Sequence, residues 1–186
     1  MIQVVFETHS ISEDNERQVA SGWSHGRLSP RGRELAGELG QRRRHDGIDV
    51  IFSSDLRRAA ETAEIAFADT AIPVLLDWRL RECDYGELNG RPLAEHPVSK
   101  ARFLDEPYPG GESWRQAVTR VGSFLDDLPS RWTGKRVLVI GHVATRWGLD
   151  HYLAGTALEE LAAADFNWQH GWEYLMQPRA AEQRHI

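Results

Sequence analysis

The chain has 186 residues, of which 41% are hydrophobic and 27% are charged, and its formal net charge is −6 at pH 7. This balance is typical of a globular protein with a sizeable core and excludes an extended disordered chain. A negative net charge argues against proteins that bind nucleic acids or anionic membranes, because such partners would repel it. An anionic ligand would therefore need a local cluster of positive side chains.

Cys83 is the only cysteine of the chain. No internal disulfide can form, and nothing indicates an oxidising compartment. The first apolar run has neither the basic segment nor the cleavage site of a signal peptide. No apolar run approaches the roughly 20 residues that a membrane-spanning helix needs. We therefore expect a cytoplasmic protein that is not inserted in a membrane.

The first half of the chain alternates apolar runs with amphipathic segments. Ser29 and Pro30 predict the start of a helix, because serine is a favoured N-cap and proline a favoured first residue. We interpret Arg42, Arg43 and Arg44 as the last turn of this helix, where cations complement the helix dipole. The expected elements are, in order, a strand at 2–6, a loop at 10–28, a helix at 29–44, a strand at 49–52, a helix at 55–67 and a strand at 73–76.

The second half begins with a loop-rich segment and then returns to the alternation. Residues 77–111 show no sustained periodicity, and an excursion of this size in a compact domain is usually functional. Residues 137–140 form the clearest buried strand, and His142 follows it closely. The further expected elements are a helix at 112–128, helices at 143–154 and 158–164, a strand at 172–176 and a loose tail at 179–186.

Alternating strands and helices predict an α/β fold in three layers, with a mostly parallel central sheet and helices on both faces. We assign residues 1–178 to a single domain, because no linker or repeat divides them. His9 and His142 each follow a strand. Since the carboxyl ends of parallel strands meet at one edge of a sheet, where ligands bind, we expect the two histidines to share a site.

Four short motifs, in this order, resemble the histidine phosphatase superfamily, which is also called phosphoglycerate mutase-like. They are His9 after the first strand, the SSDLRRAAETA segment at 53–63, the LRECDYGELNG segment at 80–90, and the Gly141-His142 pair after a strand. The resemblance extends from about residue 2 to residue 176. It implies a phosphoglycerate mutase-like α/β fold, a catalytic domain and a site for phosphoryl transfer.

The resemblance also implies a role for each of four residues. His9 attacks phosphorus and becomes phosphohistidine, since a neutral imidazole can act as a nucleophile. Arg58 and His142 bind the transferred phosphoryl group, and the arginine fork can donate two charge-assisted hydrogen bonds to it. Glu82 protonates the leaving oxygen and then activates water. This chemistry requires no metal ion, so we expect neither a metal nor a cofactor.

The chain departs from the family at the nucleophile, where Thr8-His9-Ser10 replaces the family's arginine-histidine-glycine. Threonine offers a neutral hydroxyl in place of a charged fork, and the loss of such a contact costs about 1.5–3 kcal/mol. We still expect Thr8, Ser10 and Asn15 to contact the substrate. Arg17 and Arg81 are the candidates to replace the missing positive charge.

We therefore expect a metal-independent phosphomonoesterase that acts on a small phosphorylated metabolite and binds neither nucleic acid nor a membrane. One alternative is a family scaffold with weak or lost phosphatase activity that binds a ligand or performs other acid–base chemistry. The other is a phosphoglycerate mutase, which the short excursion between Glu82 and Gly110 disfavours. Residues 84–111 are the candidate specificity segment, and their mixed side chains fit sugar phosphates, nucleotides or a specialised metabolite equally well. The sequence leaves the oligomeric state open, a homodimer included.

Overall fold

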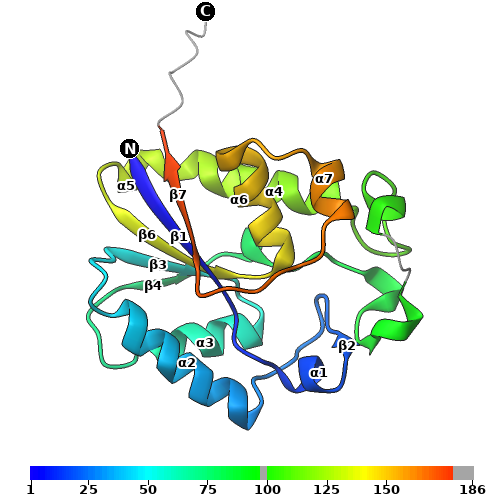
Figure 1. Ribbon diagram of the computed structural model, residues 1–186, viewed down its shortest axis with the longest axis horizontal. Helices are drawn as coiled ribbons and strands as arrows, with labels where there is room; N and C mark the ends of the chain where they lie inside the picture. The colour runs from blue at the N-terminus through cyan, green and yellow to red at the C-terminus, as the bar shows by residue number, and fades with distance from the viewer. Residues whose placement is uncertain (97–99, 178–186) are drawn as a thin grey trace, which may run out of the picture.

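A five-stranded sheet forms the centre of the protein in the computed structural model, which describes residues 1–96 and 100–177 (Figure 1). The strand order is β4-β3-β6-β1-β7. The neighbouring pairs are parallel except for β1 and β7, which are antiparallel. The strands are β1 (Ile2–Thr8), β3 (Val50–Ser53), β4 (Val74–Leu76), β6 (Arg136–Gly141) and β7 (Trp172–Met176). The expected mostly parallel sheet is confirmed.

Helices cover both faces of this sheet (Figure 1). One face carries α2 (Pro30–Arg43) and α3 (Arg57–Phe67), and the other carries α4 (Trp114–Asp127) and α6 (Val143–Ala154). The short helices are α1 (Glu13–Glu16), α5 (Pro129–Trp132) and α7 (Leu158–Ala163). Ser29 caps α2 by accepting a hydrogen bond from the backbone N–H of Gly32, as its place in the sequence predicts.

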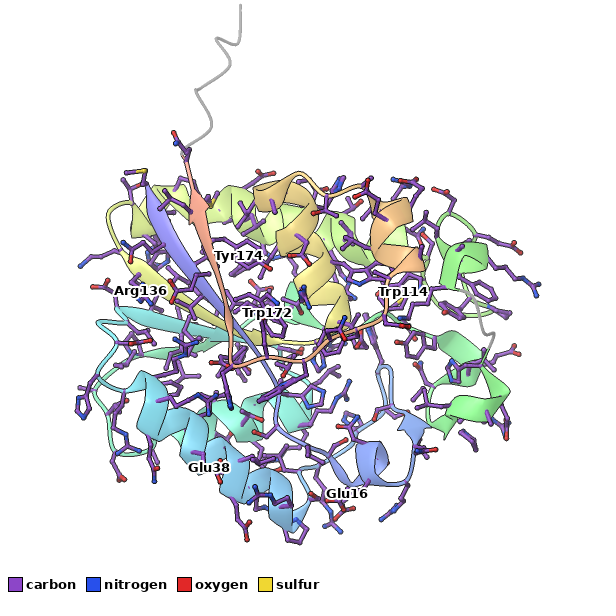
Figure 2. All side chains as sticks on the ribbon, viewed as in Figure 1. Glu16, Glu38, Trp114, Arg136, Trp172 and Tyr174 are labelled. Carbon is purple, nitrogen blue, oxygen red and sulfur yellow. The ribbon has the colours of Figure 1, made fainter. Side chains whose placement is uncertain are left out.

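The core consists of two apolar layers that the sheet separates. Val4 and Phe6 of β1 pack on the side of α4 and α6, whereas Val5 packs on the side of α2 and α3. Trp172 and Tyr174 project from β7 and are labelled in Figure 2. The Trp172 ring contacts Phe6 at 5.5 Å between centroids. Because β6 and the middle of β1 are buried on both faces, residues 137–140 and 4–6 are continuously apolar rather than alternating.

Two stretches contain more structure than the sequence predicts. Residues 10–28, expected as a loop, hold α1 and the two-residue strand β2 (Val19–Ala20), which pairs with β5 (Arg91–Pro92). Such short elements carry no periodic signal, and β2 depends on a partner about 70 residues away. The described residues of the loop-rich excursion form four 3₁₀ turns, at Trp78–Leu80, Gly86–Leu88, Leu93–Glu95 and Lys100–Phe103.

The described residues do not cover the C-terminal end of the chain. The expected tail at 179–186 lies outside the described residues, and the assignment of 1–178 to one domain stays a prediction. Among the residues that the structure describes, no helix combines the length and the apolarity needed to cross a membrane.

The arginines at the end of α2 do more than complement the helix dipole, which is the role that the sequence led us to expect. Two of them also form ion pairs with a buried carboxylate. Arg43 Nε donates to Glu7 Oε1 at 2.8 Å, and Arg43 Nη1 donates to Asp46 Oδ2 at 2.7 Å. Arg42 lies 3.5 Å from the other oxygen of Glu7. Arg42 and Arg43 still lie in the last turn of α2, and Arg44 Nε donates to the carbonyl of Gly40. The ion pairs form because Glu7 is 1% exposed, and a buried carboxylate requires a charged partner.

We expect Arg43→Met to lower the free energy of unfolding by up to about 3 kcal/mol, because it removes the hydrogen-bonded partner of the buried Glu7 and leaves only the longer contact to Arg42. Urea denaturation at pH 7 measures the change. Arg31→Met is the matched control, since Arg31 on the same helix pairs with the exposed Glu34, and its removal changes stability by about 0.5 kcal/mol at most. Equal losses in the two variants would contradict a special role for the buried pair.

Candidate active site

The carboxyl ends of β1 and β6 lie side by side and bring two histidines together. Thr8 is in register with Gly141, and the backbone N–H of His9 donates to the carbonyl of Gly141 at 3.0 Å. The rings of His9 and His142 then lie 4.9 Å apart between centroids. Parallel pairing therefore produces the juxtaposition that the two strand ends predict.

Hydrogen bonds orient His9 and define its tautomer. Its Nδ1 lies 2.7 Å from the carbonyl oxygen of Ser10, which can only accept, so Nδ1 carries the proton. Arg58 Nε donates to His9 Nε2 at 3.3 Å, so Nε2 presents a lone pair. Burial, and then the positive charge of Arg58, lower the pKa of His9 from 6.5 to about 3. His9 is thus a neutral imidazole with its basic nitrogen directed towards Arg58.

Arg58 lies in the first turn of α3 and is 2% exposed. Besides its bond to His9, it donates to the carbonyls of Gly22 at 2.8 Å and Ser24 at 3.3 Å. Burial lowers its pKa, but arginine starts so high that the group keeps its charge. Thr62, one turn further along α3, accepts a hydrogen bond from the backbone N–H of Ser10. Helix α3 therefore fixes both the cation and the backbone that orients His9.

His142 is 1% exposed, and neither of its ring nitrogens has a hydrogen-bond partner among the described residues. Its backbone N–H donates to Thr145 Oγ1, which holds it at the start of α6. Burial, then Arg58 and His9, lower its pKa well below 6.5. Buried polar atoms without partners are rare in proteins. This neutral ring therefore has the capacity to donate one hydrogen bond to a ligand beside His9.

The carboxylate of Glu82 lies at the N-terminus of α6, and the residue is 8% exposed. Its Oε1 accepts hydrogen bonds from the backbone N–H groups of Cys83 at 2.9 Å and Ala144 at 3.0 Å. Its Oε2 accepts from the N–H of Val143 at 3.3 Å. Unpaired N–H groups and the helix dipole both attract a carboxylate at this position. Glu82 and His142 thus share one helix end, because the carboxylate accepts from the two residues that follow His142.

Two side chains that were not among the predicted site residues hold the backbone of Glu82. Its carbonyl accepts hydrogen bonds from Trp23 Nε1 at 2.6 Å and from Arg120 Nη2 at 2.7 Å. Trp23 stands between Gly22 and Ser24, whose carbonyls receive the hydrogen bonds of Arg58. Loop 22–24 therefore links the guanidinium of Arg58 to the backbone of Glu82. Only the burial of Arg120 on α4, which is a tertiary property, could have identified that residue.

Three of the expected substrate-binding side chains are engaged locally. Asn15 Oδ1 accepts hydrogen bonds from the backbone N–H and the hydroxyl of Ser12. Arg17 is 67% exposed and lies 3.4 Å from Glu13. Arg81 donates two hydrogen bonds to a single carboxylate, that of Asp55, at 2.7 and 2.6 Å. The structure brings none of the three into contact with His9, and their part in substrate binding stays a prediction.

Thr8 contacts a loop that the sequence did not connect with the site. Trp168 Nε1 donates to Thr8 Oγ1 at 3.1 Å, so the hydroxyl that replaces the family's arginine accepts from an indole. Trp168 lies in the segment that leads into β7. The sequence contains no pattern that would select Trp168, because its hydrogen bond to Thr8 forms only when this loop folds back against the end of β1. In the described part of the chain, no group of three or more His, Cys, Asp or Glu side chains is arranged to hold a metal ion.

Comparison with known proteins identifies the family. The family described as the histidine phosphatase superfamily (branch 1) matches residues 6–171. The protein named probable phosphoglycerate mutase GpmB of Salmonella typhi is 34% identical over 150 residues, which cover 76% of this chain and 70% of that protein.

Solved structures of other proteins have a similar fold. YhfR of Bacillus stearothermophilus is similar in fold, with a TM-score of 0.80 and 24% identity over 91% of this chain and 88% of its own. A mycobacterial glucosyl-3-phosphoglycerate phosphatase, solved with VO3, has a TM-score of 0.77 and 25% identity over 88% of this chain and 87% of its own. The chain belongs to the histidine phosphatase superfamily, branch 1, and is an enzyme of the phosphatase type.

Proposed function

We propose that the protein is a metal-independent phosphomonoesterase that acts on a small phosphorylated metabolite through a phosphohistidine on His9. The observation that carries this proposal is the neutral His9, whose Nε2 lone pair lies beside Arg58. The adjacent His142 ring has no hydrogen-bond partner in the part of the chain that the structure describes. Phosphoryl transfer needs a nucleophile, positive charge and hydrogen-bond donors around the phosphoryl oxygens, and a proton for the leaving oxygen. Glu82 completes this set. The glucosyl-3-phosphoglycerate phosphatase solved with VO3 supports the assignment, since it shares this fold.

In the first step, the phosphoryl oxygens receive hydrogen bonds from Arg58 and His142, and Arg58 Nε turns from His9 to the substrate. His9 Nε2 then forms a bond to phosphorus while the bond from phosphorus to the alcohol oxygen breaks. Glu82 donates a proton to that oxygen, and the alcohol leaves.

In the second step, the ionised Glu82 takes a proton from a water molecule. The water oxygen forms a bond to phosphorus while the bond between phosphorus and His9 Nε2 breaks. The products are inorganic phosphate and the neutral imidazole. Burial keeps this imidazole unprotonated at neutral pH, so it is ready for the next substrate.

Different observations support the two alternative functions, a phosphoglycerate mutase and a scaffold with weak or lost activity. The name of the Salmonella relative fits the mutase alternative, which requires interconversion of 2- and 3-phosphoglycerate. The engagement of Thr8 by Trp168 favours the alternative of a scaffold with weak or lost activity, because no second guanidinium contacts His9 among the described residues. A folded protein that turns over no member of a broad phosphomonoester panel would establish that alternative.

The imidazole of His9 should remain unprotonated at neutral pH. Because the pKa of His9 is lowered to about 3, its imidazole loses its proton below the neutral range and stays neutral throughout it. Nitrogen-15 NMR, with the His9 signals assigned by comparison with His9→Asn, should therefore show no titration of this ring between about pH 5 and pH 8.

Removing the charge of Arg58 tests one cause of that shift. Arg58→Met should raise the pKa of His9, since the positive charge disfavours the imidazolium. Arg57→Met is the matched control, because Arg57 is the neighbouring residue and its side chain is 54% exposed. A wild-type His9 that titrates near 6.5 would contradict the proposed nucleophile.

Glu82 should supply the proton that the leaving alcohol needs. Glu82→Gln should lower kcat/KM for ethyl phosphate by about 10²- to 10⁴-fold, because the leaving alkoxide needs the proton. With p-nitrophenyl phosphate, whose leaving group needs no proton, the variant should still form the phosphoenzyme and then stall. The expected result is a burst of p-nitrophenolate and an acid-labile phosphohistidine. Glu87→Gln, on an exposed residue of the same loop, should keep full turnover, and a burst in His9→Asn would contradict the scheme.

An arginine restored at position 8 should strengthen catalysis. Thr8→Arg should raise kcat/KM for ethyl phosphate by roughly tenfold or more, because a charge-assisted contact to the phosphoryl group contributes about 1.5–3 kcal/mol. Thr8→Met, which is long but uncharged, should give no gain. A loss of activity in the arginine variant with its fold intact would show that Thr8 is adapted to the substrate of this protein.

A further inference from the structure

Arg120 on α4 uses its whole guanidinium inside the protein, where the residue is 8% exposed. Its Nη1 donates to the carbonyls of Arg79 at 2.8 Å and Arg81 at 2.7 Å. Its Nη2 donates to the carbonyl of Glu82 at 2.7 Å and to Glu112 Oε1, and its Nε donates to Glu112 Oε2 at 3.2 Å. A guanidinium has five N–H donors, so Arg120 has none left for a ligand.

Glu112, the ionic partner of Arg120, holds a second point of the same segment. Its Oε1 accepts from the backbone N–H of Asp84 at 3.0 Å, and its own backbone N–H donates to the carbonyl of Asp84 at 3.0 Å. Gly111 permits this close approach, because a Cβ at that position would overlap the carbonyl oxygen of Asp84. Arg120 and Glu112 together therefore fix the main chain at Glu82 and at Asp84.

Two helices hold Glu82, one at each end of the residue. Helix α4 holds its main-chain carbonyl through Arg120, whereas the N-terminus of α6 holds its carboxylate through two backbone N–H groups. The two helices lie on the same face of the sheet (Figure 1) and pack closely, since a side chain in place of Gly122 would overlap Tyr152. The position of the carboxyl group relative to His9 thus depends on both contacts.

We propose that Arg120 is a positioning residue for the acid–base steps, because it fixes the main chain from which the carboxyl group of Glu82 reaches the leaving oxygen and the attacking water. The inference rests on the proposed function, which gives Glu82 these two steps. Trp23 contributes in the same way, since its Nε1 donates to the same carbonyl at 2.6 Å. A displacement of about 1 Å can cost a positioned group about 10²-fold in rate. A buried ion pair adds little net stability over apolar side chains of the same size, so its geometry is the property that the site uses.

Two substrates with different leaving groups test this role in Arg120→Lys, which keeps the positive charge but has three donors in place of five. Ethyl phosphate needs a proton on its leaving oxygen, whereas p-nitrophenyl phosphate does not. We expect kcat/KM for ethyl phosphate to fall about 10- to 100-fold, and kcat/KM for p-nitrophenyl phosphate to stay within about threefold. Because Glu82 also activates water, the variant should release p-nitrophenolate in a burst that is followed by a slow steady state.

Further variants assign the effect to the carbonyl of Glu82, and urea denaturation establishes that each of them is folded. Trp23→Phe removes the other hydrogen bond to this carbonyl and leaves the ion pair intact, so it tests the same contact if Arg120→Lys does not fold. It should lower the ratio of the two kcat/KM values, that for ethyl phosphate over that for p-nitrophenyl phosphate, by about threefold or more. Arg115→Lys is the matched control on the same helix and should change neither value, because Arg115 is 45% exposed and pairs with Asp105. In Glu82→Gln, where the positioned group is absent, Arg120→Lys should cause no further loss with ethyl phosphate.

A purely structural role of Arg120 predicts a different pattern, in which a loss of active protein lowers kcat/KM for both substrates by the same factor. Equal losses, or additive effects of Arg120→Lys and Glu82→Gln, would overturn the positioning role and leave the phosphatase proposal standing. A wild-type protein that hydrolyses neither ester would overturn the phosphatase proposal and, with it, the role of Arg120 in catalysis.

Discussion

The arrangement of the site depends on the burial of one positive charge, the guanidinium of Arg58. A buried cation is costly unless hydrogen bonds replace its hydration. Three acceptors do so here, namely His9 Nε2 and the carbonyls of Gly22 and Ser24. The field of the same charge adds to burial in lowering the pKa values of His9 and His142. The interaction that fixes the loop geometry thus also keeps both imidazoles neutral.

The negative counterpart of Arg58 is Glu82, and its position also follows from an element terminus. The N-terminus of α6 supplies N–H groups to the carboxylate, while Trp23 and Arg120 hold its backbone carbonyl. The sheet brings α3 and α6 to the same edge, because β3 and β6 are parallel neighbours. Two helix N-termini at one sheet edge therefore set the distance between the cation and the acid–base group, and loop 22–24 joins them.

The sequence predicts the fold well where burial alone decides the structure. Strands such as β6 are continuously apolar, and His9 and His142 follow strands whose ends must meet. The sequence fails where a distant partner decides. Nothing local shows that Arg43 pairs with the buried Glu7, or that residues 19–20 pair with residues 91–92. The same limit applies to the site, since the motif predicts Glu82 but not the contact of Trp168 with Thr8.

Threonine at position 8 changes what kind of binding energy the site can use. A second guanidinium would act on phosphoryl oxygens whose charge distribution changes in the transition state, so its contribution would appear in kcat. Threonine at position 8 offers only a neutral hydroxyl, and that hydroxyl already accepts a hydrogen bond from Trp168 Nε1. Without a second charged donor, the proposed phosphoryl transfer depends on Arg58 and His142, and we expect it to be slow.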